Sequence, residues 1–598
     1  MIKEKWMIRG GRAAPIVEKY GLDPTLARIL AGRLGDNAVE EFLDRQGPLF
    51  DPSCLKDADG ASMMLIRDLS KGGSVCIVGD YDVDGVTATA ILYLGLSRMF
   101  PSAQVGFRIP ERMSEGYGIS LSIAEEIADH GFTHVITCDN GIAAPEPIEW
   151  MKDRGIRVIV TDHHEIPYSD QKEEILPGAD YVIDPHRKGD LSPQKEICGA
   201  FVALQLVRLI YRQFFLNASE PEWMKLLYGY AALGTICDVM PLTGQNRRLA
   251  YQGIRILNER PSVGIRCLMN VAEVGILDPV TIGFRIGPML NAGGRLGSQN
   301  KYVHILLSRD ETQCFQIARE LMNANRLRQD MTEKGVEEGI RQLKSADSED
   351  LVKVIYLPDL HESIAGLVAG KIKEQIYRPV LVLTKGEEGL KGSARSIESY
   401  MMVDELAKVR DHFTKMGGHA MAAGFSLDAK EGEEEKVVDR LRKALNERCV
   451  LSEDDLIPTV WIDAQLQPSA VTLPLIDRLE LLAPFGVKNP KPQLASRGLS
   501  LLRARIRGAK GNVISLLLHD EGGVLDAVCF EKAMIDELIR EAEDPESLME
   551  EMEHGIYFST PIPVDIVYEA SIDRYYGSPR VKIQVKHIRY SQMKPNLV

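Results

Sequence analysis

The stretch Val75-Cys-Ile-Val78-Gly-Asp80-Tyr-Asp82-Val-Asp84-Gly85 joins a short apolar run to three alternating carboxylates. Short apolar runs rich in β-branched residues are typical of buried strands. Three later runs have the same form, and each also ends in polar side chains. They are residues 134–137 before Asp139-Asn140-Gly141, residues 157–160 before Asp162-His163-His164, and residues 181–183 before Asp184-Pro185.

Helical stretches separate these four runs, which predicts parallel strands in an α/β sheet. Ligands of open α/β sheets bind at the carboxyl ends of the strands, so the polar residues are expected to meet in one cleft. Carboxylates with imidazole suit Mn²⁺ or Mg²⁺, and unpaired carboxylates in one cleft would repel each other without cations. The sequence therefore predicts a metal-dependent hydrolase.

The 598 residues are expected to form several domains. Breakers and periodicity divide the chain into an N-terminal helical segment, an α/β domain with a parallel sheet, a long connecting helix, a second α/β domain and a C-terminal β-barrel. In the second α/β domain we expect a tight turn at residues 392–396 and a loop at residues 417–419. An acidic helix at residues 531–553 is expected to interrupt the barrel. The predicted bounds of the five parts are 1–50, 51–310, 311–350, 351–455 and 456–598.

The net charge of −15 does not exclude a nucleic-acid partner, because binding depends on the field in a groove. Residues 531–553 alone hold ten acidic and two basic side chains. The nine cysteines form no CxxC pair, which indicates a reducing compartment. The N-terminal residues lack the apolar core of a signal peptide, and no apolar stretch reaches membrane-spanning length. We therefore expect a cytoplasmic protein with no membrane partner.

Less specific interpretations compete at each motif. Asp80, Asp82 and Asp84 are spaced as in a calcium EF-hand, but the twelfth position of that loop would be Ile91 rather than Glu, and a strand precedes it. Each motif taken alone leaves an alternative open. For the three aspartates it is a solvated acidic turn, and for the adjacent His163 and His164 it is an ordinary polar loop. Asp238 lies in apolar surroundings, where burial without a partner would be costly, and a metal would supply that partner.

These motifs resemble a known superfamily. Asp-x-Asp-x-Asp-Gly, Asp-Asn-Gly, Asp-His-His and the segment Gly234-Thr-Ile-Cys-Asp238-Val-Met-Pro are similar to the four motifs of the DHH phosphoesterases. Gly392-Ser-Ala-Arg-Ser and Gly418-His419 resemble the DHHA1 domain of the same superfamily. Three further segments resemble its RecJ branch. They are Pro110-Glu-Arg112-Met-Ser-Glu-Gly-Tyr-Gly, Pro288-Met-Leu-Asn291-Ala-Gly-Gly-Arg295 and Ala483-Pro-Phe-Gly486-Val-Lys-Asn489-Pro.

The resemblance implies a site with two divalent cations, Mn²⁺ or Mg²⁺, that activate water for in-line attack on a phosphodiester. His164 would lie near the scissile phosphate. The catalytic residues that the resemblance implies are Asp82, Asp84, Asp139, His163, His164 and Asp238. The metal ligands it implies are Asp80, Asp82, Asp84, Asp139, His163 and Asp238. The activity it implies is a single-stranded-DNA-specific 5′→3′ exonuclease that releases 5′-mononucleotides in DNA repair and recombination.

The resemblance also implies a pocket for the 5′-phosphate, although a simple tight turn at residues 392–396 remains the alternative. In the barrel, Arg503, Arg505 and Arg507 alternate with Ala504 and Ile506, so a strand would carry the three guanidinium groups on one face. A merely solvated strand face is the competing interpretation; an oligonucleotide/oligosaccharide-binding (OB) fold is what the resemblance implies. The implied phosphate-pocket residues are Arg112, Arg295, Ser393, Arg395, Gly417, Gly418 and His419.

Two other functions stay open. One is a phosphodiesterase of short oligonucleotides or cyclic dinucleotides, whose relatives generally comprise only the two α/β domains. The other is a non-enzymatic replication scaffold similar to the Cdc45 branch, in which the acidic motifs have decayed. The expected partners are single-stranded DNA, a single-strand-binding protein and a helicase, and the protein is expected to be a monomer.

Overall fold

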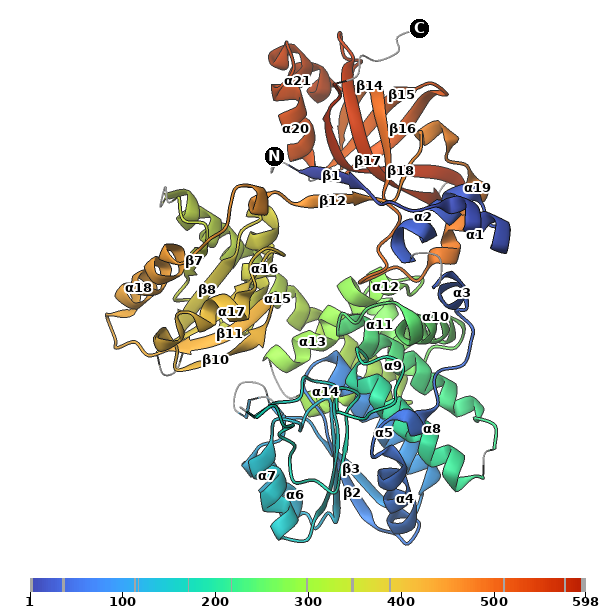
Figure 1. Ribbon diagram of the computed structural model, residues 1–598, viewed down its shortest axis with the longest axis vertical. Helices are drawn as coiled ribbons and strands as arrows, with labels where there is room; N and C mark the ends of the chain where they lie inside the picture. Colours follow the sequence, from blue (N-terminus) through green and yellow to red (C-terminus); the bar gives the residue numbers. More distant parts are fainter. Residues whose placement is uncertain are drawn as a thin grey trace. The chain divides into compact units, whose positions relative to one another are not determined.

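The computed structural model describes residues 4–34, 38–111, 115–116, 118–169, 171–216, 218–296, 299–345, 349–386, 389–508, 511–574 and 577–592, with only the backbone at 295, 296 and 299. The chain divides into two units (Figure 1). The parallel-sheet unit comprises Glu40–Leu327 and Leu482–Pro490. The mixed unit comprises Met1–Val39, Arg328–Leu481 and Lys491–Val598.

The parallel-sheet unit is built on five parallel strands in the order β3-β2-β4-β5-β6. The four apolar runs predicted as strands all belong to this sheet, which confirms the predicted α/β class. The strand order reverses between β2 and β4, and such a reversal opens a crevice at the carboxyl ends of the strands. The strands are β2 (Ser74–Val78), β3 (Gln104–Arg108), β4 (His134–Cys138), β5 (Arg157–Thr161) and β6 (Tyr181–Ile183).

Helices cover both faces of this sheet. Val75 and Ile77 pack in the core that contains α5, α8 and α9, whereas Cys76 and Val78 pack in the core that contains α6 and α7. Because both faces are buried, each strand is apolar throughout rather than alternating. The helices of this unit are α3 (Val39–Leu43), α4 (Ala58–Leu69), α5 (Val83–Met99), α6 (Leu121–Asp129), α7 (Pro145–Asp153), α8 (Gly199–Phe214), α9 (Lys225–Cys237), α10 (Gly244–Glu259), α11 (Val263–Val271), α12 (Pro279–Thr281), the π-helix η3 (Ile282–Ile286), α13 (Gly287–Leu296) and α14 (Gln299–Leu307).

A 35-residue helix, α15 (Glu311–Ser345), follows, which confirms the predicted long connecting helix. The second α/β domain contains a five-stranded sheet in the order β10-β11-β9-β8-β7, in which only β7 and β8 are parallel. Its elements are β7 (Lys353–Tyr356), α16 (Ala365–Ile376), β8 (Val380–Lys385), β9 (Leu390–Arg395), α17 (Met402–Ala407), β10 (Lys415–His419), β11 (Ala422–Leu427) and α18 (Glu434–Glu447).

Two predictions for this domain are wrong. Residues 392–395 belong to strand β9 rather than to a tight turn, and residues 417–419 end strand β10 rather than forming a loop. The glycines in both segments favoured turns, but here they lie in paired strands. At Gly418 the backbone has φ 152°, and a Cβ would lie 2.3 Å from the carbonyl oxygen of Ala422. Glycine is therefore needed there for close packing of two strands.

The C-terminal region forms a closed five-stranded barrel, because β14 pairs with both β15 and β17, as the sequence predicted. The acidic stretch is not one helix: it forms α20 (Lys532–Arg540) and α21 (Pro545–His554), with residues 541–544 between them and Pro545 as the first residue of α21. Proline is tolerated at the first helical position but not within a helix. The remaining strands and helix are β12 (Thr459–Ile462), β13 (Ala464–Gln465), α19 (Leu473–Leu479), β14 (Leu494–Arg507), β15 (Val513–Asp520), β16 (Gly523–Cys529), β17 (Ile562–Asp573) and β18 (Arg580–Tyr590).

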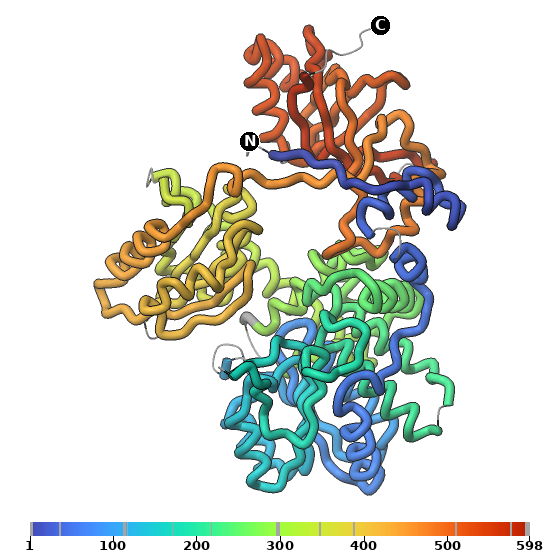
Figure 2. The backbone as a smooth tube through the Cα atoms, viewed as in Figure 1, coloured from blue at the N-terminus to red at the C-terminus, as the bar shows by residue number. Residues whose placement is uncertain are grey.

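The N-terminal segment packs beside a distant part of the chain. In addition to the helices α1 (Ala13–Tyr20) and α2 (Pro24–Leu34), it contains the strand β1 (Lys5–Ile8), which pairs in parallel with β12 (Figure 2). Arg33 fixes this arrangement by two hydrogen bonds to the carboxylate of Asp463, at 2.8 and 2.7 Å. Among the described residues, no helix combines the length and the apolar character that crossing a bilayer requires.

Candidate metal centre and nucleic-acid interface

The first three aspartates follow strand β2. Asp82 is the N-cap of α5, where its Oδ1 accepts from the amide of Gly85 at 3.1 Å. Asp84 lies in the first turn of α5 and accepts from the amides of Gly199 at 2.6 Å and Ala200 at 2.9 Å. These two amides begin helix α8, so the positive end of the helix dipole stabilises the charge of Asp84. The sequence did not reveal the roles of Gly199 and Ala200.

Strands β4 and β5 contribute the next two side chains. Asp139 follows β4 in the left-handed conformation, with φ 63°. The Nε2 atom of His163, which follows β5, lies 3.0 Å from Oδ1 of Asp139 and 3.6 Å from Oδ2 of Asp84. The same nitrogen lies 3.7 Å from Oδ2 of Asp238, the C-cap of α9. His163 is therefore the centre around which carboxylates from three other elements gather.

The donor atoms of these residues form three overlapping groups, in each of which they lie within 4.8 Å of one another. His163 belongs to two of them and Asp139 to two, so the groups are one continuous cluster. All six residues predicted as metal ligands belong to it, and so does His164. The groups are Asp80, Asp82 and Asp139; Asp84, His163 and Asp238; and Asp139, His163 and His164.

The electrostatics of this cluster fit divalent cations. Burial first, and then the charges of Asp84 and Asp82, raise the pKa of Asp139 and of Asp238 well above the usual range. Burial and the charge of Asp84 also raise the pKa of Asp82. Oδ2 of Asp238 is buried and has no hydrogen-bond donor among the described residues. Buried carboxylates that repel each other are stabilised by a metal, and oxygen donors with one imidazole suit Mg²⁺ or Mn²⁺.

His164 is oriented by Asp162, a residue for which the sequence indicated no separate role. Oδ1 of Asp162 accepts from Nδ1 of His164 at 2.7 Å, and the carboxylate also accepts from the amides of His163 and Ile142. Burial opposes the charged imidazole, but the hydrogen bond and the charge of Asp162 outweigh it and raise the pKa of His164 to about 9. Because Nδ1 is held in this way, Nε2 is the nitrogen left for other contacts.

Four of the five predicted phosphate residues of the second α/β domain, Ser393, Arg395, Gly417 and His419, lie on one face of its sheet. Ser393 in β9 pairs with Gly424 in β11, which in turn pairs with Gly417 in β10. The next row on the same face is Arg395, Ala422 and His419. Directly opposite residues share a face, so the glycines leave a flat floor beside the polar side chains. Gly418 lies between Gly417 and His419 and points to the opposite face.

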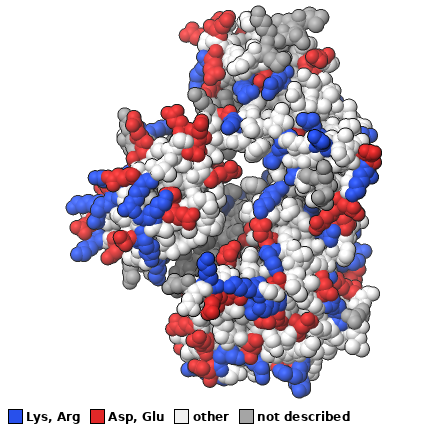
Figure 3. Space-filling model, in the orientation of Figure 1, with Lys and Arg blue, Asp and Glu red and all other residues white. Residues whose placement is uncertain are grey.

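Helix α16 begins at the edge of this floor. A Cβ at Gly366 would lie 2.7 Å from Nη2 of Arg395 and 2.9 Å from Oγ of Ser393, so the first turn of the helix contacts both side chains. Nη1 of Arg395 donates to Oγ of Ser393 at 3.1 Å. Lys391 and Lys415 extend the same face by one further row. In Figure 3, Lys and Arg side chains lie among Asp and Glu side chains over this domain, at the left of the view.

The arginine stripe of the barrel has the predicted alternation. Arg505 and Arg507 are exposed and Arg503 is half-buried, whereas Ala504 is fully buried. The guanidinium of Arg503 lies over the ring of Tyr557, 5.2 Å from its centroid. Arg112 lies outside the described residues, and so does the side chain of Arg295. The nearby Asn291 is described, and its side-chain oxygen accepts from the amide of Val83 at 3.0 Å.

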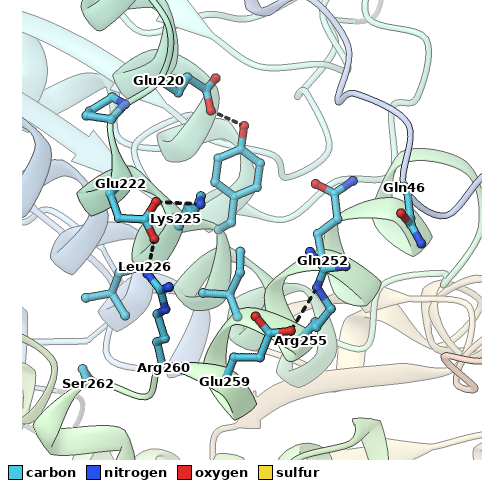
Figure 4. Close-up of a pocket in the computed structure, with 13 residues that line it drawn as sticks. Gln46, Glu220, Glu222, Lys225, Leu226, Gln252, Arg255, Glu259, Arg260 and Ser262 are labelled. Atoms are coloured by element: carbon cyan, nitrogen blue, oxygen red, sulfur yellow. Dashed lines mark hydrogen bonds and ion pairs between the residues drawn. The ribbon is translucent and has the colours of Figure 1, made fainter.

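A separate cavity of about 510 Å³ lies at the other end of helix α9 (Figure 4). Most of its charged side chains pair with one another: Glu222 pairs with Lys225 and Arg260, and Glu259 pairs with Arg255. Lys225 begins α9, whereas Asp238 follows its last residue, so the 13-residue helix separates them by about 20 Å. This cavity therefore does not belong to the metal cluster.

The fold and the cluster together define a class. Residues 74–235 match the model of the DHH family N-terminal domain, residues 351–450 match the DHHA1 domain, and residues 462–587 match the RecJ OB domain. The chain thus combines a DHH domain, a DHHA1 domain and a C-terminal barrel that matches the RecJ OB domain.

The particular family follows from whole-chain comparisons. The chain is 32% identical to the single-stranded-DNA-specific exonuclease RecJ of Bacillus subtilis over 99% of its own length and 71% of that protein. It is 34% identical to the RecJ of Haemophilus influenzae over 87% of its own length and 91% of that protein. The chain belongs to the RecJ family of exonucleases.

Solved structures agree with this assignment. The crystal structure of RecJ from Thermus thermophilus in complex with Mn²⁺ matches with a TM-score of 0.79 at 25% identity, covering 99% of this chain and 81% of that chain. The Mg²⁺ complex from the same organism matches in fold, with a TM-score of 0.74 at 24% identity over 99% of this chain and 79% of that chain. RecJ enzymes that hold either ion thus share this fold.

Proposed function

We propose that this protein is a single-stranded-DNA-specific exonuclease that degrades strands in the 5′→3′ direction and releases 5′-mononucleotides. The observation that carries the proposal is the cluster around His163, in which carboxylates from three segments of the chain meet the imidazoles of His163 and His164. Membership of the RecJ family supports the substrate, because the relatives are described as single-stranded-DNA-specific exonucleases.

We further propose that the cluster holds two Mn²⁺ or Mg²⁺ ions. When bound, such ions activate water and neutralise developing charge on the phosphate oxygens. The chain supplies the orientation: Asp84 is fixed by the amides of α8, and Asp162 fixes His164 so that Nε2 can donate to a scissile phosphate. The proposed ligands are Asp80, Asp82, Asp84, Asp139, His163 and Asp238.

The direction of degradation would come from the second α/β domain. A terminal 5′-phosphate has the charge and the acceptors to bind Ser393 and the guanidinium of Arg395. The exposed backbone around Gly417 and Gly418, together with His419, would complete its contacts on the flat floor of the sheet. Arg112 and Arg295 are proposed as further phosphate ligands from the parallel-sheet unit.

The barrel would hold the strand further from its end. Exposed arginines on a barrel strand, with Tyr557 beside Arg503, combine charge and an aromatic surface as single-strand-binding barrels do. We propose that the protein acts as a monomer in the cytoplasm, in DNA repair and recombination. A single-strand-binding protein and a helicase would be its partners there.

Digestion of end-labelled single strands tests this function. We expect a strand labelled at its 5′ end to release labelled mononucleotide at once, and a strand labelled at its 3′ end to shorten progressively, both only with Mn²⁺ or Mg²⁺. Duplexes of the same sequence should resist. Release of label from the 3′ end first would overturn the direction, and faster cleavage of dinucleotides than of long strands would favour a phosphodiesterase of short oligonucleotides instead.

A further inference from the structure

A cavity of about 520 Å³ opens beside His164 in the parallel-sheet unit. Its walls come from the segment that leads into α6, from the loop between β4 and α7, and from the residues that follow β5. It therefore lies at the same carboxyl edge of the sheet as the metal cluster. Asp162 and His164 belong to both the cavity wall and the site described above.

The lining of this cavity is mostly apolar. Seven of its side chains are aliphatic or proline, and they come from the starts of α6 and α7 and from the loops that precede these helices. Its volume lies within the range of small-ligand sites, which are about 300–1,000 Å³. The seven residues are Ile119, Leu121, Ile142, Ala143, Ala144, Pro145 and Pro147.

Apart from His164, which is paired with Asp162, the charged side chains that line the cavity are carboxylates. Glu146 and Glu165 line it and are both exposed, and no Lys or Arg is among its described lining residues. A second phosphate of the strand would be repelled by these carboxylates. A flat neutral group with N–H donors would instead contact the apolar walls with its faces and donate to the carboxylates at its edge. Nucleobases have this chemistry.

We propose that this cavity binds the nucleobase of a nucleotide that adjoins the scissile phosphate. The inference rests on the proposed nuclease function and adds the recognition of a base beside the reacting bond. His164 lies between the cavity and the metal cluster. Asp162 accepts a hydrogen bond from its Nδ1, and 45% of its side chain is exposed. The base would then align the scissile phosphate with the metal cluster, because base and phosphate belong to one nucleotide.

A series of abasic substrates tests the proposal with the wild-type protein alone. Single strands carrying one abasic residue at position 1, 2 or 3 from the 5′ end are digested with Mn²⁺, and the rate of the first cleavage is compared with that of the intact strand. We expect a loss of about tenfold at position 1 or 2, since a base contact of this kind is typically worth about 5- to 150-fold. Equal rates for all strands would overturn the inference.

A filled cavity provides the second arm. Ala144 is half-buried, has φ −119°, and caps α7 without a side-chain hydrogen bond, so Ala144→Trp fills the cavity without removing a contact. Glu125→Trp on the exposed face of α6 is the matched control. Ala144→Trp should reduce the difference between intact and abasic strands to within about twofold, whereas the control should keep it. An unchanged difference in Ala144→Trp would overturn the inference.

Failure of this inference can be told from failure of the proposed function. A wild-type protein that degrades intact strands but ignores missing bases contradicts the base site alone. A wild-type protein that cleaves no single strand contradicts the nuclease proposal itself. Binding of Mn²⁺ to Ala144→Trp, measured by calorimetry, checks that the variant is folded around its cluster; a variant that fails this check is replaced by Ala144→Leu, judged by the same outcomes.

Discussion

The amide of Gly199 donates to Oδ2 of Asp84 at 2.6 Å, and a Cβ added at Gly199 would lie 2.7 Å from the Cβ of Asp139. One glycine at the start of α8 therefore sets the spacing of two proposed ligands that come from different strands. The contact leaves no room for a methyl group unless backbone atoms move. We therefore expect Gly199 to tolerate substitution poorly, although it has no side chain of its own.

Gly199→Ala should weaken metal binding without abolishing folding. Overpacking of this kind typically costs about 1–3 kcal/mol, and here the strain falls on Asp139. We expect Mn²⁺ affinity and cleavage to fall at least about tenfold, measured by calorimetry and by strand digestion. Gly275→Ala is the control, because its Cβ would meet nothing within 4 Å. Equal activity of Gly199→Ala and the control would contradict the proposed ligand geometry.

Asp162→Asn should slow the chemical step. The variant keeps the shape of the side chain but removes the charge that faces Nδ1 of His164, so it lowers the pKa of the imidazole from about 9. Loss of an orienting partner typically costs about 10- to 100-fold. We expect kcat to fall by this factor with KM nearly constant, and the pH above which activity declines to shift downward. A parallel loss in strand affinity would indicate a structural role.

Metal binding should stabilise the wild type more than Asp238→Asn. Burial first, and then the charges of Asp84 and Asp82, raise the pKa of Asp238. Neutralising this side chain relieves the repulsion and should raise the melting temperature of the metal-free protein. At 100 times the dissociation constant, one bound ion contributes about 2.7 kcal/mol to the wild type. Thermal unfolding with Mn²⁺ and with chelator measures both effects. A larger gain from Mn²⁺ in Asp238→Asn would remove it from the proposed ligands.

Arg395→Ala should discriminate between strand ends. Hydrogen bonds to a charged group contribute about 1.5–3 kcal/mol, so cleavage of 5′-phosphorylated strands should fall about 10- to 150-fold. Strands with a 5′-hydroxyl should be affected much less. Lys371→Ala, a substitution of an exposed residue on α16 of the same domain, should leave the cleavage rates of both kinds of strand unchanged. Indifference of Arg395→Ala to the end group would exclude Arg395 from the phosphate pocket.

Replacing Arg503, Arg505 and Arg507 together by Gln should change the salt dependence of binding. Each phosphate contact to a single strand contributes about 0.7 to the slope of log K against log salt, so the slope should decrease by about 2. Fluorescence anisotropy with labelled strands at several salt concentrations measures this. Lys430→Gln, exposed in another domain, should leave the slope unchanged. A triple variant with the wild-type slope would mean a solvated strand face.

The sequence was sufficient to predict the parallel strands and the clustering of the polar side chains that follow them, because each apolar run ends where its polar residues begin. It was insufficient for strand β9, where Gly392 has no side chain and interrupts the inward alternation of Leu390 and Ala394. It also could not reveal the amides that bind Asp84. Helix α8 starts at Cys198 without a side-chain cap, so no capping residue marked its beginning. The role of Asp162 depends on the backbone conformation after β5, which the sequence alone does not show.

The pairing of β1 with β12 has a consequence for biosynthesis. Lys5 lies opposite Thr459, so β1 cannot pair with β12 until most of the polypeptide has left the ribosome. At about 5–20 residues per second, that delay is on the order of 20 to 90 seconds. During that time Lys5–Ile8 has no partner strand, and its backbone groups are available for pairing with a chaperone or with a neighbouring nascent chain.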